Sequence, residues 1–224
     1  MKKSILAIAL LSSLSSMAFA NQGGDILVRG GATMVTPDSS QTPIYLAGDN
    51  SAGLALSVDD NTQLGLNLVY FFDSNWAIEV LAATPFTHDV TIHDPQAALG
   101  VDGVKLAEVT HLPPTLSALY YFDTGSAFKP YVGLGVNYTI FFDEEFEAAP
   151  QSLGLTNLEL DGSFGYSVQV GIDYDLGDNW SVNGSARYID ISSDASFDVG
   201  GSSIGSASID VDPMVYSLML GYTF

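Results

Sequence analysis

The sequence predicts an all-β fold, an eight-stranded, antiparallel, up-and-down transmembrane β-barrel. Three observations predict it. Apolar residues alternate with small or polar ones in eight stretches, and the connections between the stretches are long and short in turn. In addition, no part of the chain beyond the N-terminus approaches the run of about 18 apolar residues that a membrane-spanning helix needs.

The C-terminal stretch, residues 212–224, shows the alternation most clearly. One of its faces is wholly apolar and consists of Met214, Tyr216, Leu218, Leu220, Tyr222 and Phe224. A period of two is that of a strand. An exposed apolar edge strand would aggregate in water, whereas a closed barrel has no edge and offers its apolar face to lipid. We expect the aromatic residues Tyr222 and Phe224 to be the signal that the outer-membrane assembly machinery recognises.

The first four strands are expected at 25–35, 61–72, 76–86 and 112–122. The first has mostly small residues around Arg29, and the second has leucine or an aromatic residue at every even position from 64 to 72. In the third strand, Trp76 and Phe86 mark the two ends of the apolar face. In the fourth, apolar residues fall at every second position from Leu116 to Phe122.

The fifth, sixth and seventh strands are expected at 131–142, 164–174 and 180–188, and the C-terminal stretch is the eighth. Each carries Val, Ile, Leu or aromatic residues on one face, opposite mainly Gly, Ser, Asn, Thr or Gln. The short turns are 73–75, 123–128 and 177–179, and the long polar connections are 36–60, 87–111, 143–161 and 190–207. Alternate connections of an up-and-down barrel lie at opposite ends, so all the long ones are expected at one rim, as in bacterial outer-membrane barrels.

The orientation of the two faces separates a membrane barrel from a soluble eight-stranded barrel, which is the alternative. A soluble barrel needs charged residues on its outer face. Here the acidic residues concentrate in the connections, so the apolar faces are expected to meet lipid and the small polar faces the lumen. Aromatic residues support this by gathering near both ends of the strands, with Trp76 and Trp180 by the short turns and Phe86 and Phe164 by the long connections.

The N-terminus has the features of a secretory signal. Residues 1–20 combine Lys2 and Lys3, an apolar run and the small-residue motif Ala18-Phe19-Ala20. We therefore expect a signal peptide at 1–20 and the barrel at 21–224, located in the outer membrane. The chain has no cysteine, and its net charge of −20 argues against nucleic acid as a partner.

Five segments resemble the outer membrane protein W family. They are 61–66 (Asn-Thr-Gln-Leu-Gly-Leu), 81–86 (Leu-Ala-Ala-Thr-Pro-Phe), 111–115 (His-Leu-Pro-Pro-Thr), 129–139 (Lys-Pro-Tyr-Val-Gly-Leu-Gly-Val-Asn-Tyr-Thr) and Asp212-Pro213. The resemblance extends over almost the whole mature chain. It implies an eight-stranded outer-membrane barrel with a narrow, largely apolar channel for small hydrophobic compounds, which leave sideways into the membrane.

The alternation places a set of side chains in the lumen. They are Arg29, Glu79, Leu81, Asn137, Gln169, Asp173 and Arg187. The lumen of an eight-stranded barrel is filled by side chains, although the inward glycines are expected to leave some room. Leu81 is either an apolar constriction or ordinary interior packing. The four charged residues are expected to form ion pairs, since a lone charge in a narrow lumen is costly, and these pairs are expected to act as a structural plug.

Three prolines predict a weak point in the wall. Pro113 and Pro114 remove two hydrogen-bond donors near the start of the fourth strand, and Pro85 faces them from the end of the third. The interrupted pairing is either a lateral opening towards lipid or a simple strand boundary at the rim.

No motif points to a metal, a cofactor or an enzyme. The three histidines, His88, His93 and His111, lack a zinc-binding spacing, and the acidic residues near 143–147 fit no calcium loop. We therefore expect a monomeric channel for passive uptake of small hydrophobic compounds, with membrane lipid and lipopolysaccharide as its surroundings. The alternative is a structural or adhesive surface barrel with a closed lumen that acts through its extracellular loops.

Overall fold

A computed structural model describes residues 21–38, 42–46, 53–97 and 100–224. The expected signal peptide, residues 1–20, lies outside the described residues. Of the residues described, no helical stretch is long and apolar enough to cross a membrane.

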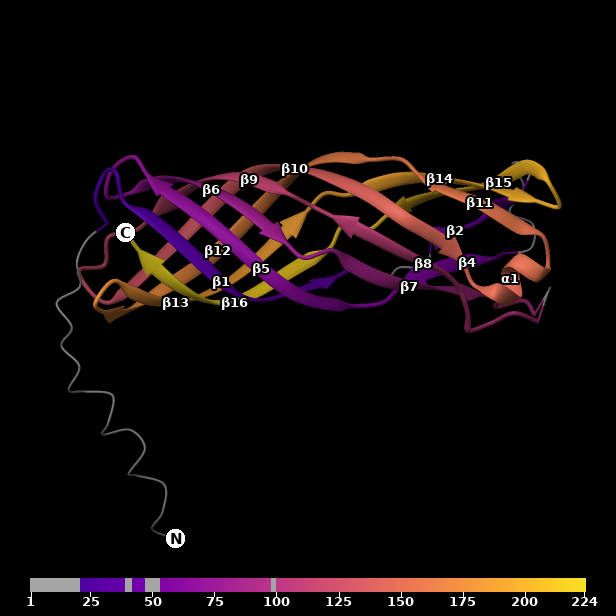
Figure 1. The fold of residues 1–224 in the computed structure, drawn as a ribbon, viewed down its shortest axis with the longest axis horizontal. Helices are drawn as coiled ribbons and strands as arrows, with labels where there is room; N and C mark the ends of the chain where they lie inside the picture. The colour runs from indigo at the N-terminus through magenta and orange to yellow at the C-terminus, as the bar shows by residue number, and fades with distance from the viewer. Residues whose placement is uncertain (1–20, 39–41, 47–52, 98–99) are drawn as a thin grey trace, which may run out of the picture.

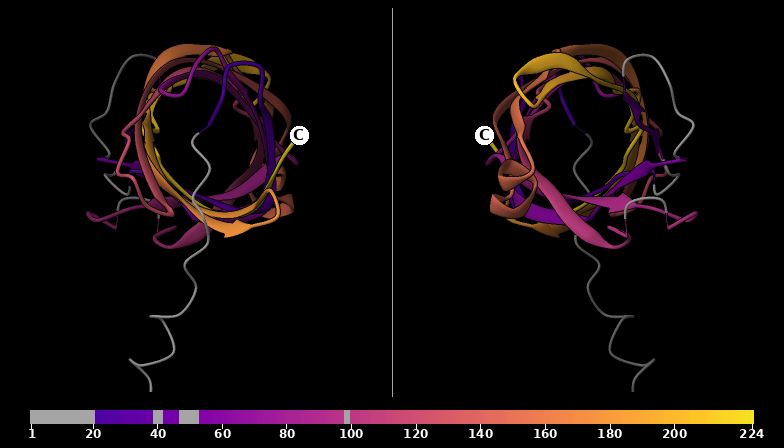
Figure 2. Two further views of the ribbon diagram at one scale, coloured as in Figure 1. Left: turned by 90° about the vertical axis from the view of Figure 1, so that its left-hand side faces the viewer. Right: turned by 90° about the vertical axis from the view of Figure 1, so that its right-hand side faces the viewer.

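The strands pair in a closed ring of eight, which is the barrel in Figures 1 and 2. The strands of the ring are β1 (Ile26–Thr36), β5 (Asn61–Phe71), β6 (Trp76–Ala83), β9 (Thr115–Tyr121), β10 (Phe128–Phe146), β12 (Ser163–Gly177), β13 (Trp180–Ile189) and β16 (Met214–Thr223). Each pairs antiparallel with the next, and β16 pairs with β1 from Thr223↔Leu27 to Met214↔Thr36. The predicted fold class is therefore confirmed.

The four long connections all lie at one end of the ring, as expected, and they contain further strands that continue the barrel wall there (Figure 1). They contain β2 (Thr42–Pro43), β3 (Tyr45–Leu46), β4 (Ala55–Val58), β7 (Phe86–His93), β8 (Val104–Leu112), α1 (Ala148–Ser152), β11 (Leu155–Leu160), β14 (Ser192–Val199) and β15 (Ser202–Asp210). We call this part the extension. The strands of the extension form backbone hydrogen bonds with one another. The backbone groups of each polar connection are therefore paired with segments that are distant in the sequence, and local sequence patterns do not identify these partners.

The apolar faces of the ring point outward, as predicted. Leu64, Leu134 and Leu218 expose 56, 68 and 65% of their surface. Aromatic pairs such as Trp76–Tyr120 and Trp180–Tyr222, with ring centroids 5.0 Å apart, lie near the short turns. An apolar band edged by aromatic residues is the outer surface of a membrane barrel.

The third predicted strand is wrong at its end, because the alternation shifts phase at Thr84-Pro85. β6 stops at Ala83, β7 starts at Phe86, and Phe86 is buried inside with 1% exposure instead of facing lipid. Along β7 the inward positions are then apolar or histidine, while Thr87, Asp89 and Thr91 alternate with them. β7 and its partner β8 therefore lie outside the membrane-spanning segments.

Three apolar clusters fill the interior. The largest lies in the extension around Leu56, Phe146 and Phe197, and a second, near the short turns, includes Val69, Phe71 and Leu119. Between them lies the third, which consists of Val35, Phe86, Ile189, Ile191 and Val215.

Candidate functional site: a filled lumen below an apolar chamber

A buried network of charges fills the lumen of the ring. The Arg29 guanidinium donates to Asp173 at 2.5 Å (Nη2 to Oδ2) and 3.1 Å (Nε to Oδ1), and to Glu79 Oε2 at 3.1 Å. Arg187 pairs with the other oxygen of Glu79. Two arginines thus meet two carboxylates, so the buried charge is balanced, which offsets the desolvation that a lone ion would suffer. The predicted ion pairs are confirmed.

Gln169 completes what we call the lumen network (Arg29, Glu79, Gln169, Asp173 and Arg187). Its amide donates to Glu79 Oε1 at 2.9 Å and accepts from Arg187 Nη2 at 2.6 Å. All five residues are at most 3% exposed. They come from four strands, β1, β6, β12 and β13, so the network joins much of the barrel wall.

Two tyrosines fill the remaining space beside the network. The Tyr121 hydroxyl contacts both Arg29 and Asp173, and Tyr131 accepts from Asn183 at 3.1 Å. Tyr131 occupies the space that a side chain at Gly171 would need. The expectation that inward glycines leave room at the centre is therefore wrong, because these glycines accommodate large side chains from neighbouring strands.

Leu81 and Asn137 also lie inside the barrel, on the side of the extension. Leu81 is 5% exposed and lines a small cavity of about 10 Å³ with Val35, Pro113 and Val215. The Asn137 amide donates to the Pro114 carbonyl at 3.1 Å, which fastens the proline segment to β10.

The hydrogen-bond ladder of the wall is interrupted beside this cavity. Pairing of β6 with β9 ends at Leu81↔Thr115, and pairing of β7 with β8 starts at Phe86↔His111. Residues 82–85 and 112–114 in between are unpaired with each other, and we call this interruption the ladder gap. On the other side the wall is continuous, because the Tyr138 amide donates to the Pro114 carbonyl at 3.2 Å. Pro85 and Pro114 are exposed, whereas Pro113 is buried.

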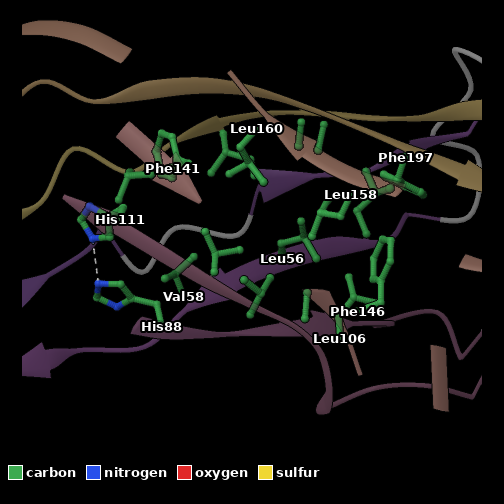
Figure 3. Close-up of a pocket in the computed structure, with 18 of the residues that line it drawn as sticks. Leu56, Val58, His88, Leu106, His111, Phe141, Phe146, Leu158, Leu160 and Phe197 are labelled. Carbon is green, nitrogen blue, oxygen red and sulfur yellow. Dashed lines mark hydrogen bonds between the residues drawn. The ribbon is translucent and has the colours of Figure 1, made fainter. Parts of the chain in front are cut away.

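A chamber with almost entirely apolar walls lies inside the extension (Figure 3). We call it the apolar chamber, and it encloses about 70 Å³ of free space. Its lining consists of Ile44, Leu56, Val58, His88, Val90, Leu106, Ala107, Val109, His111, Phe141, Phe146, Leu158, Leu160, Ile191, Ala195, Phe197, Ala207, Ile209 and Val211.

Two histidines form one end of the chamber, opposite Phe146 and Phe197 (Figure 3). His88 Nε2 and His111 Nε2 are 3.0 Å apart, and their ring centroids are 5.0 Å apart. Phe86 and Phe141 flank His111 with centroid distances of 5.7 and 5.8 Å. We call these four residues the aromatic stack.

Burial favours the neutral form of both rings. Burial lowers the pKa of His88. Burial, together with the neighbouring His88 ring, lowers the pKa of His111 to about 3. Removing an imidazolium from water is unfavourable, so the uncharged form persists in the apolar chamber.

A second cavity, of about 400 Å³, lies on the other side of the lumen network, by the short turns. It is lined by Asp25, Asp173, Asp175 and Trp180 among others. Because Asp173 belongs to the network and also lines this cavity, the network separates it from the apolar chamber.

The terminal aromatic residues lie on the outer surface at the short-turn end. Tyr222 and Phe224 pack edge to face with centroids 4.8 Å apart, and Phe224 is 72% exposed.

Comparison with known proteins places the chain in a family. The model of the OmpW family matches residues 22–224. This chain belongs to the OmpW family. The outer membrane protein W of Vibrio cholerae is 41% identical over 226 residues, covering 100% of both chains. The crystal structure of the outer membrane protein OprG from Pseudomonas aeruginosa superposes with a TM-score of 0.84 at 39% identity, covering 92% of this chain and 98% of that one.

A further relative is the dibenzothiophene metabolism operon protein PahQ of Pseudomonas aeruginosa, 26% identical over 223 residues and covering 100% of this chain and 99% of PahQ. Together with the barrel, the OmpW membership makes the chain an outer-membrane β-barrel protein, as predicted.

Sequence reasoning missed the chamber and the histidine pair. The inward alternation Phe86, His88, Val90 and Ile92 was the available signal, since it predicts a strand with a buried face inside the supposed connection. His93, which falls on the other face of β7, is not part of the pair and is hydrogen-bonded to Ser57.

Proposed function

We propose that this OmpW-family barrel admits small apolar compounds passively from the cell exterior through the apolar chamber. They leave sideways into the membrane at the ladder gap. The observation that carries the proposal is the position of the chamber, which is above a filled lumen and beside an interrupted wall.

The physics of the lumen favours a lateral route over an axial one. A compound moving down from the chamber reaches the depth of Leu81, where the lumen network lies below it and lipid lies beside it. Entering the charged network is unfavourable for an apolar compound, because it would exchange apolar contacts for polar ones. Entering lipid is favourable, because the apolar contacts are kept. Leu81 then acts as apolar lining at the turning point.

The route needs one side-chain movement. Phe86 lines the small cavity at Pro113 and its ring contacts His111, which lines the chamber. Rotation of the Phe86 ring would connect the two spaces. The relative PahQ is named after a dibenzothiophene metabolism operon, and dibenzothiophene is an apolar aromatic compound. This name supports the proposal that apolar compounds are what the barrel admits.

The test is uptake by cells with and without the protein, comparing p-xylene with a polar compound of similar size. Faster uptake of p-xylene alone is expected. Replacing Pro113 and Pro114 together by valine supplies two donors and a β-branched side chain that favours pairing, so it should close the gap and slow p-xylene uptake severalfold. Pro43→Val, in the exposed β2, is the matched control and should change nothing. Equal uptake with and without the protein would refute the proposal.

The second candidate is a structural or adhesive barrel. The lumen network favours it, because the ring is filled so closely that all charges of the network are buried. In that case the extension is the working surface and neither compound depends on the protein for uptake. Cell attachment would then fall when the β14–β15 hairpin is removed.

We further propose that the barrel is a monomer in contact with lipid and lipopolysaccharide and that the assembly machinery inserts it by recognising Tyr222 and Phe224. The outward apolar band and the exposed Phe224 support this.

A further inference from the structure

The wall of the extension consists of two sheets. The end of β10 together with β8, β7, β4 and β2 continues the sheet of the ring, whereas β11, β14, β15 and β3 form a separate four-stranded sheet. The apolar chamber lies between them, because Leu56 and Phe146 line it from the first sheet and Leu160 and Phe197 line it from the second. The way in which the two sheets are joined therefore determines where a compound can enter the chamber.

On one side the two sheets are joined by the chain itself. β2 and β3 are separated only by Ile44. β2 pairs with β4 of the first sheet, and β3 pairs with β15 of the second. Ile44 is 5% exposed and lines the chamber. Here the wall is held together by covalent bonds and by a hydrogen-bond ladder on either side of Ile44.

On the other side, between β10 and β11, the two sheets are not paired. The ladder between β10 and β12 ends at Thr139↔Ser163. Beyond this pair, residues 140–146 of β10 pair with β8, and β11 pairs with β14. Among the residues that the structure describes, no backbone hydrogen bond joins residues 140–146 to β11. We call this line between β10 and β11 the seam.

Ion pairs do not close the seam either. Residues 140–146 include three acidic residues, Asp143, Glu144 and Glu145, and residues 155–161 include Glu159 and Asp161. Neither segment contains a lysine or an arginine. Like charges repel one another, so the two edges of the seam have no electrostatic attraction that would hold them together.

The seam borders the apolar chamber directly. Phe141 from β10 and Leu158 and Leu160 from β11 line the chamber, and all three are half-buried. The chamber encloses about 70 Å³, which is roughly half of an engineered cavity of about 150 Å³ that takes benzene. A compound with a ring therefore enters only if the wall moves. Separating β10 from β11 breaks no ladder, whereas separating β7 from β8 or β14 from β15 would break one.

The seam starts at the outer edge of the membrane-spanning ring. The last outward pair below it is Tyr138↔Phe164, and these two aromatic side chains are 52 and 73% exposed. Aromatic residues of this kind lie at the interface between membrane and water. An apolar compound that gathers at the outer surface of the membrane is therefore close to the seam.

We propose that the seam is the entrance of the apolar chamber, where β10 and β11 move apart and admit small apolar compounds from the cell exterior. The last ring pair, Thr139↔Ser163, limits the opening at one end, and the segment that contains α1 limits it at the other. This inference rests on the proposed function, since it gives the uptake route an entrance that is distinct from its exit at the ladder gap.

A reversible bridge across the seam tests the entrance. The chain has no cysteine, so Glu145→Cys/Glu159→Cys places two unique thiols at exposed positions on either side of the seam. A bifunctional thiol reagent bridges them, with the product confirmed by mass, and a reductant removes the bridge. Uptake of p-xylene by cells should fall severalfold with the bridge and recover after reduction.

The matched control is Glu159→Cys/Ser196→Cys. These two exposed positions are opposite each other in the ladder between β11 and β14, so a bridge adds a link where the wall is already paired. It should leave p-xylene uptake unchanged. Unchanged uptake after bridging Glu145→Cys/Glu159→Cys would overturn the inference.

Spin labels on the same two pairs measure the opening without uptake. In lipid nanodiscs, Glu145→Cys/Glu159→Cys should give a broad distribution of distances, and Glu159→Cys/Ser196→Cys should give a narrow one. Equally narrow distributions would overturn the inference. If p-xylene uptake depends on the protein but not on the bridge, only this inference fails. If uptake does not depend on the protein at all, the proposed function fails, and the entrance fails with it.

Discussion

Arg29, Glu79, Asp173 and Arg187 illustrate how single residues decide what the lumen can do. Each lies on the small polar face of its strand, and none is more than 3% exposed. The ion pairs between these residues offset the cost of burying their charges. Each residue is therefore needed, because removing one of them leaves its partner charged and unpaired.

Glu79→Gln tests this dependence directly. Glu79 contacts both Arg29 and Arg187, so its neutralisation leaves an excess buried positive charge. The free energy of unfolding should fall by about 3–5 kcal/mol, measured by urea denaturation in lipid vesicles. Glu159→Gln, at an exposed position in β11, should change it by less than about 0.5 kcal/mol. Equal stability of the two variants would contradict the role of the network.

Two glycines test the packing of the lumen. A Cβ at Gly171 would overlap the Tyr131 ring, whereas a Cβ at Gly184 would meet nothing within 4 Å. Gly171→Ala should therefore cost about 1–3 kcal/mol by overpacking, and Gly184→Ala should not destabilise the barrel. The measurement is the temperature at which each purified variant loses the fast gel migration of the folded barrel. If both shift equally, Tyr131 does not fill the lumen as described.

At the scale of elements, the extension is a separate construction on top of a closed ring. β13 pairs directly with β16 from Trp180↔Tyr222 to Tyr188↔Met214, so the ring does not need the β14–β15 hairpin between them. The chamber does need it, because Ala195, Phe197, Ala207 and Ile209 belong to its lining.

Replacing residues 193–209 by Asn-Gly should separate the two parts. This dipeptide favours the tight turn of a two-residue hairpin, so the strand ends can still pair. The shortened barrel should keep heat-modifiable migration, while p-xylene uptake should fall severalfold because the chamber has lost one wall. Replacing only Gly200-Gly201 at the hairpin tip by Asn-Gly is the control. Unchanged uptake after the larger replacement would exclude the chamber from the route.

At the scale of the whole molecule, closure by β1 and β16 joins the first and last strands and removes every free edge from the ring. The last residue then lies on the outer surface, where it contributes little packing. Its proposed role belongs to assembly and not to stability.

Phe224→Ala tests that role against Phe164→Ala, since the two side chains are 72 and 73% exposed and lie at opposite ends of the ring. Refolding of the purified variants into lipid vesicles should be the same for both. The amount in the outer membrane should drop severalfold for Phe224→Ala alone. A similar amount of both variants would argue against a terminal assembly signal.

The alternation of residues was enough to predict the eight strands, the outward apolar band and the inward position of Arg29 and Glu79, because the two-residue period of a strand assigns faces locally. It was also enough to predict the interruption at Pro85, Pro113 and Pro114, since proline lacks a donor wherever it stands.

Only the tertiary structure decided what those faces contact. Whether Arg29 pairs with Asp173, 144 positions along the chain, depends on closure and register, which no local pattern contains. The same holds for Phe86, whose face reversed when the strand broke at Thr84-Pro85, and for the chamber. The lining of the chamber comes from segments that are polar at every second position. Their apolar faces become buried only when these segments pack against one another. The sequence by itself thus determined a membrane barrel with an interrupted wall, and the long-range contacts decided that its lumen is filled and that the apolar space lies above it.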